Sequence, residues 1–194
     1  INDVSSGEIT SAYLKAPFDK GKKALNDKGY EIISLEENAM LRILKSNIDS
    51  VKRGNWVKED VIYVPDKGKF LTKNSPIMEN TGYAIECNRK GGGFLLTDEQ
   101  VEKALEDSVL ISDKIIPTNR FGDNEVTVFA FGDYAKDYGE LLRSNSVINM
   151  LIHSENLPNR PIAVKLSLGG SSELIGLDCP LYLNNRVRGL LKQR

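Results

Sequence analysis

Residues that commonly carry metal or nucleophilic chemistry are scarce in this 194-residue chain, which has one histidine and two cysteines. Cys87 and Cys179 lie far apart, and neither belongs to a C-x-x-C pair, so zinc ligands would have to be mostly carboxylates. A pair between His153 and either cysteine is the one nucleophilic arrangement left open, although free cysteines are more often small core residues. The sequence therefore predicts no metal site and no cofactor.

Glycine-rich phosphate-binding loops are also missing. The run Arg89–Phe94 lacks the G-x-x-x-x-G-K-[ST] spacing that cradles a nucleotide. Lys69 is followed by Phe70, where a magnesium-binding hydroxyl would be needed. Both segments are interpreted as loops or turns.

Long apolar runs and excess charge of one sign are absent too. No stretch approaches the roughly 20 apolar residues that cross a bilayer, and the N-terminal segment INDVSSGEIT lacks the pattern of a signal peptide. We therefore expect a cytoplasmic protein without a membrane partner. The net charge of −1 argues against a general basic excess for nucleic-acid binding, but it leaves a local basic patch open.

Strand-like runs followed by helix starts recur along the chain. Ser34 and Glu37 form a capping box after the strand-like residues 30–33, and Thr97 and Gln100 form a second one after residues 94–96. A third unit is predicted at residues 125–131, which alternate like a strand, with Asp133 capping the helix that follows. Phosphate binding at these three junctions competes with ordinary capping, which their own acidic residues favour.

The pattern predicts an α/β fold, with α+β left open, in which helices pack on a mixed β-sheet. Pro65, Asp66 and Gly68 are typical turn residues, so one β-hairpin is expected near residues 61–72. We expect a single globular domain over residues 1–194, and a two-lobed form with a boundary near 111–124 is the alternative.

Two basic clusters are candidate binding sites. Trp56 and other aromatic residues interleave with lysines around the predicted hairpin, a pattern that suits single-stranded nucleic acid. The other cluster lies near the C-terminus. A solvated hairpin rim with a basic tail is the alternative. The candidate binding residues are Lys67, Lys69, Lys73, Trp56, Arg186 and Arg188.

We expect a non-enzymatic binding or interaction domain for an anionic partner, nucleic acid included, or for a protein. An enzyme with an acid–base site built from Asp123 and Asp133 near Arg120 is the first alternative. A self-associating structural protein is the second. The sequence determines neither the partner nor the oligomeric state.

Overall fold

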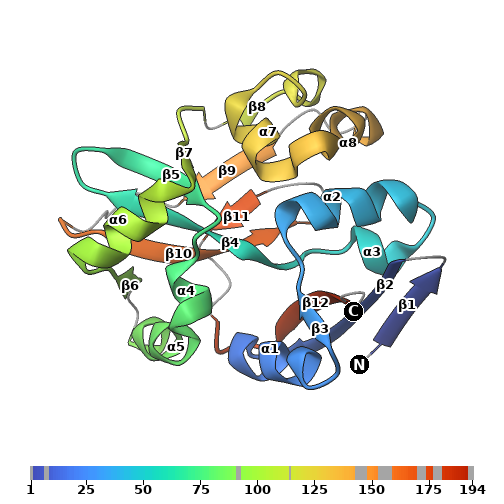
Figure 1. Cartoon of the computed structure of the whole chain (residues 1–194), viewed down its shortest axis with the longest axis horizontal. Helices are drawn as coiled ribbons and strands as arrows, with labels where there is room; N and C mark the ends of the chain where they lie inside the picture. The colour runs from blue at the N-terminus through green and yellow to red at the C-terminus, as the bar shows by residue number, and fades with distance from the viewer. Residues whose placement is uncertain are drawn as a thin grey trace.

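The structure is a computed structural model that describes residues 2–6, 9–90, 93–113, 115–142, 148–152, 159–169, 174–176 and 181–191 (Figure 1). His153 and Cys179, which the sequence left open as a nucleophilic pair, lie outside these residues.

A mixed β-sheet organises the described part of the chain. Its main path runs β1-β2-β12-β4-β10-β11-β9-β8, with β3 paired to β12, β5 to β4, β6 to β10, and β7 to β5. The pairs β12–β4 and β11–β9 are parallel, and the other pairs are antiparallel. The strands are β1 (Asn2–Ser6), β2 (Ile9–Ala16), β3 (Tyr30–Ile32), β4 (Asn55–Val64), β5 (Gly68–Thr72), β6 (Phe94–Leu95), β7 (Ser108–Leu110), β8 (Ile115–Ile116), β9 (Ile148–Ile152), β10 (Ile162–Leu168), β11 (Leu174–Gly176) and β12 (Asn185–Leu191).

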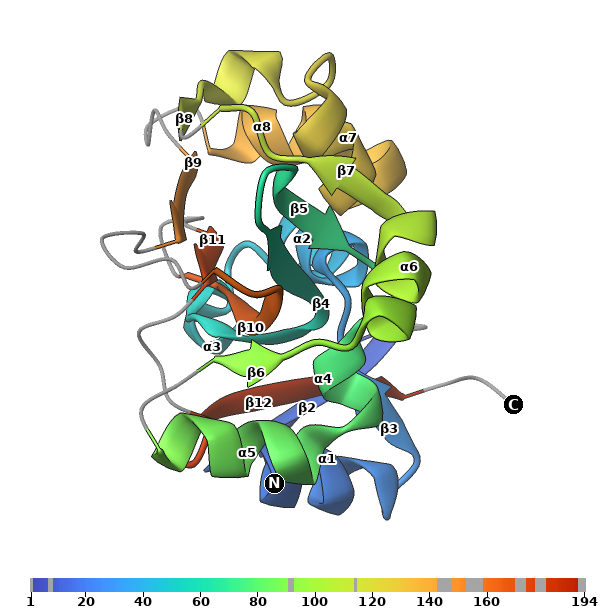
Figure 2. The same cartoon turned by 90° about the vertical axis from the view of Figure 1, so that its left-hand side faces the viewer.

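Short helices surround this sheet. Figure 2 shows α7 and α8 at one end of the molecule and α1 and α5 at the other, with strands between them. The helices are α1 (Phe18–Asn26), α2 (Leu35–Leu44), α3 (Asp49–Lys52), α4 (Pro76–Glu79), α5 (Thr81–Arg89), α6 (Asp98–Glu106), α7 (Glu125–Phe131) and α8 (Ala135–Leu141), with the 3-10 turns η1 (Thr118–Arg120) and η2 (Gly132–Tyr134). None of the helices in the described ranges is long and apolar enough to cross a membrane.

Strand β4 separates two hydrophobic clusters. Val57 and Val61 pack into the first cluster with residues of α2, α7 and α8. Trp56 and Ile62 pack into the second cluster with residues of α1, α5 and α6. Side chains alternate across a strand, so β4 has apolar cover on both faces, and it pairs with β10, β5 and β12. The predicted fold class, helices packed on a mixed sheet, is confirmed.

Local sequence signals place several of these elements. Both predicted capping boxes form, at Ser34 with Glu37 and at Thr97 with Gln100. The predicted hairpin is also confirmed: β4 and β5 are antiparallel, and Asp66 in their turn has a left-handed φ of 63°. The β4 strand is longer than predicted, because it begins at Asn55.

The predicted strand at residues 125–131 is wrong, because this segment forms helix α7. The Asn124 side chain accepts hydrogen bonds from the amides of Val126 and Thr127, which starts the helix. Val126 and Ala130 are buried one turn apart, whereas Val128 is 42% exposed. The buried positions thus follow a helical period, and packing overrides the strand preference of the β-branched residues.

The predicted helix cap at Asp133 is also wrong. Asp133 lies in η2, and α8 begins at Ala135 without a side-chain cap. Gly132 absorbs the change of direction between α7 and η2 with a φ of 53°. The chain can therefore turn there without help from the aspartate side chain.

Candidate functional site

The β4–β5 hairpin presents the predicted lysines in different environments. Lys67, in the turn, and Lys73, just after β5, are exposed, whereas Lys69 is half-buried. Lys69 pairs with Tyr63 across the hairpin, so both side chains lie on the same face. Because Leu71 on that face belongs to the cluster under α7, the Lys69 side of the hairpin faces α7.

Lys73 makes a cation–π contact with α7 that was not predicted from the sequence. Its ammonium lies 4.7 Å from the centre of the half-buried Phe129 ring. Half-buried Ile111 lies beside Lys69, to whose carbonyl oxygen it donates a backbone hydrogen bond of 2.8 Å. We define the hairpin surface as Tyr63, Lys67, Lys69, Lys73, Ile111 and Phe129. Phe129 lies in the segment 125–131, and its contact with Lys73, 56 positions earlier, leaves no local signal in the sequence.

Trp56 does not belong to this surface. Its side chain is 1% exposed and packs edge-on against Phe18 at a centroid distance of 6.0 Å. Phe70 faces the second hydrophobic cluster, because it pairs with Ile62, which belongs to that cluster. The predicted interleaving of lysines with these two aromatic residues is therefore not formed in space.

Arg186 and Arg188 do not form an exposed basic tail. They lie on β12, and their exposed fractions are only 6% and 0%. Since β12 pairs with β2, β3 and β4, the backbone of both arginines is part of the sheet, and their side chains are buried rather than solvated. The structure therefore separates them from the hairpin lysines.

The proposed acid–base residues are close in sequence but do not converge. The backbone carbonyl of Arg120 accepts hydrogen bonds from the amides of Asp123 and Asn124, at 3.1 and 2.9 Å, which fixes this loop. Among the described residues, no side-chain hydrogen bond or ion pair joins Arg120, Asp123 and Asp133, and all three are exposed. An acid–base mechanism through these residues stays a prediction.

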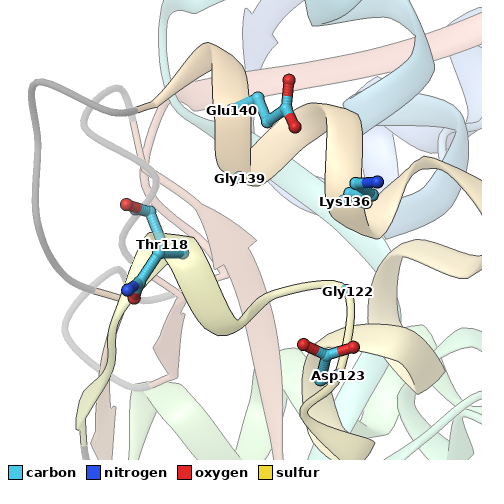
Figure 3. Close-up of a pocket in the computed structure, with 7 residues that line it drawn as sticks. Thr118, Gly122, Asp123, Lys136, Gly139 and Glu140 are labelled. Carbon is cyan, nitrogen blue, oxygen red and sulfur yellow. The ribbon is translucent and has the colours of Figure 1, made fainter.

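A depression of about 300 Å³ lies beside Asp123 (Figure 3). Lys136 and Glu140 come from α8, and Thr118 comes from η1. Figure 3 shows the carboxylates of Asp123 and Glu140 on different sides of the depression. No group of three or more histidine, cysteine, aspartate or glutamate side chains able to hold a metal occurs in the described part of the chain.

At two of the helix N-termini considered for phosphate binding, side chains of the protein itself accept hydrogen bonds from backbone amides. The amide of Leu35 donates to both carboxylate oxygens of Glu59, at 3.1 and 3.0 Å, while Ser34 and Glu37 close the capping box. The Thr97 box closes in the same way with Gln100. These amides are already satisfied, so the capping interpretation fits both junctions.

A buried ionic network joins strands β4 and β10 and was not predicted from the sequence. Lys165 Nζ lies 2.9 Å from the carboxylate of Asp60 and 2.6 Å from the carbonyl oxygen of Lys58. Ser75 donates to the same Asp60 carboxylate at 2.5 Å. Desolvation raises the pKa of nearby Glu59 to about 7 and lowers the pKa of Lys165. Because these side chains are enclosed, the network holds β4, β10 and α4 together.

A second depression, of about 350 Å³, lies between α1, β3 and β4. Lys22 lines it and donates to the carbonyl oxygen of Met78 at 2.5 Å and to Thr81 Oγ1 at 3.2 Å. Desolvation and the neighbouring Lys165 lower the pKa of Lys22. Lys58, on the same rim, lies 3.5 Å from the Glu31 carboxylate. The ammonium groups of Lys22 and Lys58 therefore both interact with neighbouring residues of the protein.

Comparison with known proteins shows the fold. No protein-family model matches the chain, and no curated protein matches its sequence. A solved structure from work on the accommodation of massive sequence variation in Nanoarchaeota by the C-type lectin fold is similar, with a TM-score of 0.70 and 14% identity. The match covers 96% of this chain and 99% of that one. The chain therefore has the architecture of the C-type lectin fold.

Proposed function

We propose that this protein is a non-enzymatic binding domain that holds an acidic segment of a protein partner on the hairpin surface. The observation that carries the proposal is the contact between Lys73 and Phe129, which combines an exposed ammonium with an aromatic ring at 4.7 Å. A partner carboxylate approaching Lys73 would also meet the half-buried side chains of Phe129, on α7, and Ile111, just after β7. The C-type lectin fold of the similar structure, and the sequence variation that this fold accommodates there, support a binding role.

The charges and aromatic rings favour an acidic protein segment over single-stranded nucleic acid. Nucleic acid of that kind needs a basic groove with open aromatic faces on which bases stack. Here Lys73 covers Phe129, and Trp56 is buried. Asp66 is next to Lys67 in the turn and limits the positive charge there. Tyr63 and Ile111 are half-buried, which suits the mixed apolar and polar character of a protein interface.

A fluorescent peptide of alternating glutamate and leucine tests the proposal by anisotropy titration at low and physiological salt. A triple variant, Lys67→Glu, Lys69→Glu and Lys73→Glu, should weaken binding by at least about tenfold, because like charges now face each other. The matched control reverses three exposed lysines elsewhere, Lys20→Glu, Lys28→Glu and Lys90→Glu. This control has the same net charge and should bind like the wild type.

Equal weakening in both triple variants would contradict the proposal, because only net charge would then matter. Binding of a single-stranded oligonucleotide in place of the peptide, with the same loss on hairpin reversal, would assign the surface to nucleic acid instead. Normal circular dichroism spectra of both variants establish that the fold is kept.

A further inference from the structure

A second group of cationic side chains gathers on one face of the β2–β12 pair. Arg186 and Arg188 are two positions apart on β12, so their side chains lie on the same face. The antiparallel register sets Arg186 opposite Lys15 and Arg188 opposite Tyr13, and opposed residues project to the same side. Arg53, which follows α3, acts electrostatically on Arg186. We call these five residues the arginine cradle.

Tyr13 is the common support of the two arginines. The guanidinium carbon of Arg186 lies 4.7 Å from the centre of the Tyr13 ring, and that of Arg188 lies 5.0 Å from it. Arg188 is held further by hydrogen bonds to Ser11 Oγ at 3.1 Å and to the carbonyl oxygen of Ser50 at 2.6 Å. The two guanidinium groups are thus placed close together by a rigid strand pair.

The positive charge of the cradle is not balanced within the described residues. No described carboxylate lies within ion-pair distance of Arg186 or Arg188. The Nε atoms of both arginines are enclosed and have no hydrogen-bond partner in the part of the chain that the structure describes. Desolvation, with repulsion from Arg186 and Arg42, lowers the pKa of Arg188 to about 10. Buried charges in proteins are normally paired, so this arrangement calls for an anion.

The cradle is enclosed but lies near the surface. Arg186 is 6% exposed, whereas its neighbours Lys15 and Arg53 are exposed. Exposed cations at the rim of a site raise the local concentration of anions. No side-chain hydrogen bond engages Arg186 within the described residues, in contrast to Arg188. Arg186 is therefore the donor that remains for a ligand.

We propose that the arginine cradle binds a small oxyanion: a carboxylate, phosphate or sulfate group. A guanidinium matches the spacing of two oxygen atoms with two parallel N–H donors, which suits this ligand class. Arg186 would hold the anion, Lys15 and Arg53 would attract it, and Tyr13 with Arg188 would fix the geometry. The site uses other elements than the hairpin surface, so it goes beyond the proposed function and stands independently of it.

Titration of the full chain with sodium phosphate, sodium sulfate and sodium acetate, at constant ionic strength set with chloride, tests the site. Saturable shifts of the Tyr13, Arg53 and Arg186 backbone amide signals are expected in NMR spectra. Arg186→Gln should weaken the binding at least about tenfold. The control Lys28→Gln, an exposed lysine in the turn after α1, should leave the affinity unchanged.

A second variant keeps the test decisive if Arg186→Gln fails to fold. Lys15→Gln combined with Arg53→Gln alters only exposed side chains, so it should keep the fold and lower the affinity at least about threefold. Absence of saturable binding by the wild type, or wild-type affinity in the variants that fold, would overturn the proposal. Preference for acetate would identify a carboxylate ligand, and preference for phosphate or sulfate a tetrahedral one.

Discussion

Lys165 and Asp60 form an ion pair of 2.9 Å, although their side chains are 1% and 0% exposed and 105 positions separate them in the sequence. The pair joins β10 to β4, and Ser75 and the amide of Ile77 add hydrogen bonds to the Asp60 carboxylate. The ion pair therefore stabilises the pairing of β4 with β10 in addition to the apolar packing on both faces of β4.

Removing one member of this pair should be strongly destabilising. Lys165→Met leaves the Asp60 carboxylate buried without its counter-charge, for which a loss of about 3–5 kcal/mol in unfolding free energy is expected. The matched control is Lys103→Met, since Lys103 pairs with Glu79 at 2.6 Å and both are about half exposed. That change should have little effect on stability, because ion pairs between solvent-exposed side chains contribute little. Urea unfolding measures both, and a Lys165→Met loss as small as the control's would refute the structural role.

The raised pKa of Glu59 should make the stability of the protein depend on pH. Its folded-state pKa is raised to about 7 by desolvation. A carboxyl group with a raised pKa contributes stability that is fully present below its unfolded-state pKa and is lost as the pH rises through the folded-state value. Between about pH 4.5 and pH 7, the contribution of Glu59 to stability should therefore decrease.

The variant Glu59→Gln should remove this pH dependence and gain on the order of 3 kcal/mol relative to wild type between pH 5 and pH 8. Thermal unfolding across this range provides the measurement. The exposed residue Glu102 supplies the control, since Glu102→Gln should follow the wild-type curve. Parallel curves for wild type and Glu59→Gln would show that Glu59 does not titrate as proposed.

Gly21 allows α1 to approach β12 closely. A Cβ atom at this position would lie 2.4 Å from Val187 Cγ2. Gly21→Ala should therefore destabilise by about 1–3 kcal/mol through overpacking, despite the better helix propensity of alanine. Gly82, in α5, has open space at the same position, so Gly82→Ala should be neutral or stabilise by up to about 1 kcal/mol. Chemical unfolding of the two alanine variants distinguishes these effects, and equal stabilities would contradict the close packing.

The elements predicted correctly from the sequence are those determined by residues that lie close together in the chain. The Ser34 and Thr97 capping boxes and the Asp66 turn depend on residues within a few positions of each other. Residues 125–131 were mispredicted because Val126, Thr127 and Val128 favour strands locally, while the contacts that make them helical come from distant elements.

The candidate sites could be predicted less well, because they depend on contacts between distant segments. The lysines at 67–73 were found, but Phe129, their aromatic neighbour, lies on α7. Arg186 and Arg188 were found as a basic cluster, yet their burial follows from the pairing of β12 with β2 and β4. No local pattern reports which strands are neighbours.

The most direct test of the proposed binding role is an NMR footprint of the glutamate–leucine peptide on the isotope-labelled wild-type protein. The account predicts that the largest amide shifts fall on Lys67, Lys69, Lys73, Ile111 and Phe129, with little change at Lys20, Lys28 and Lys90. Shifts spread evenly over exposed lysines, or confined to the arginine cradle, would contradict the hairpin surface as the binding site.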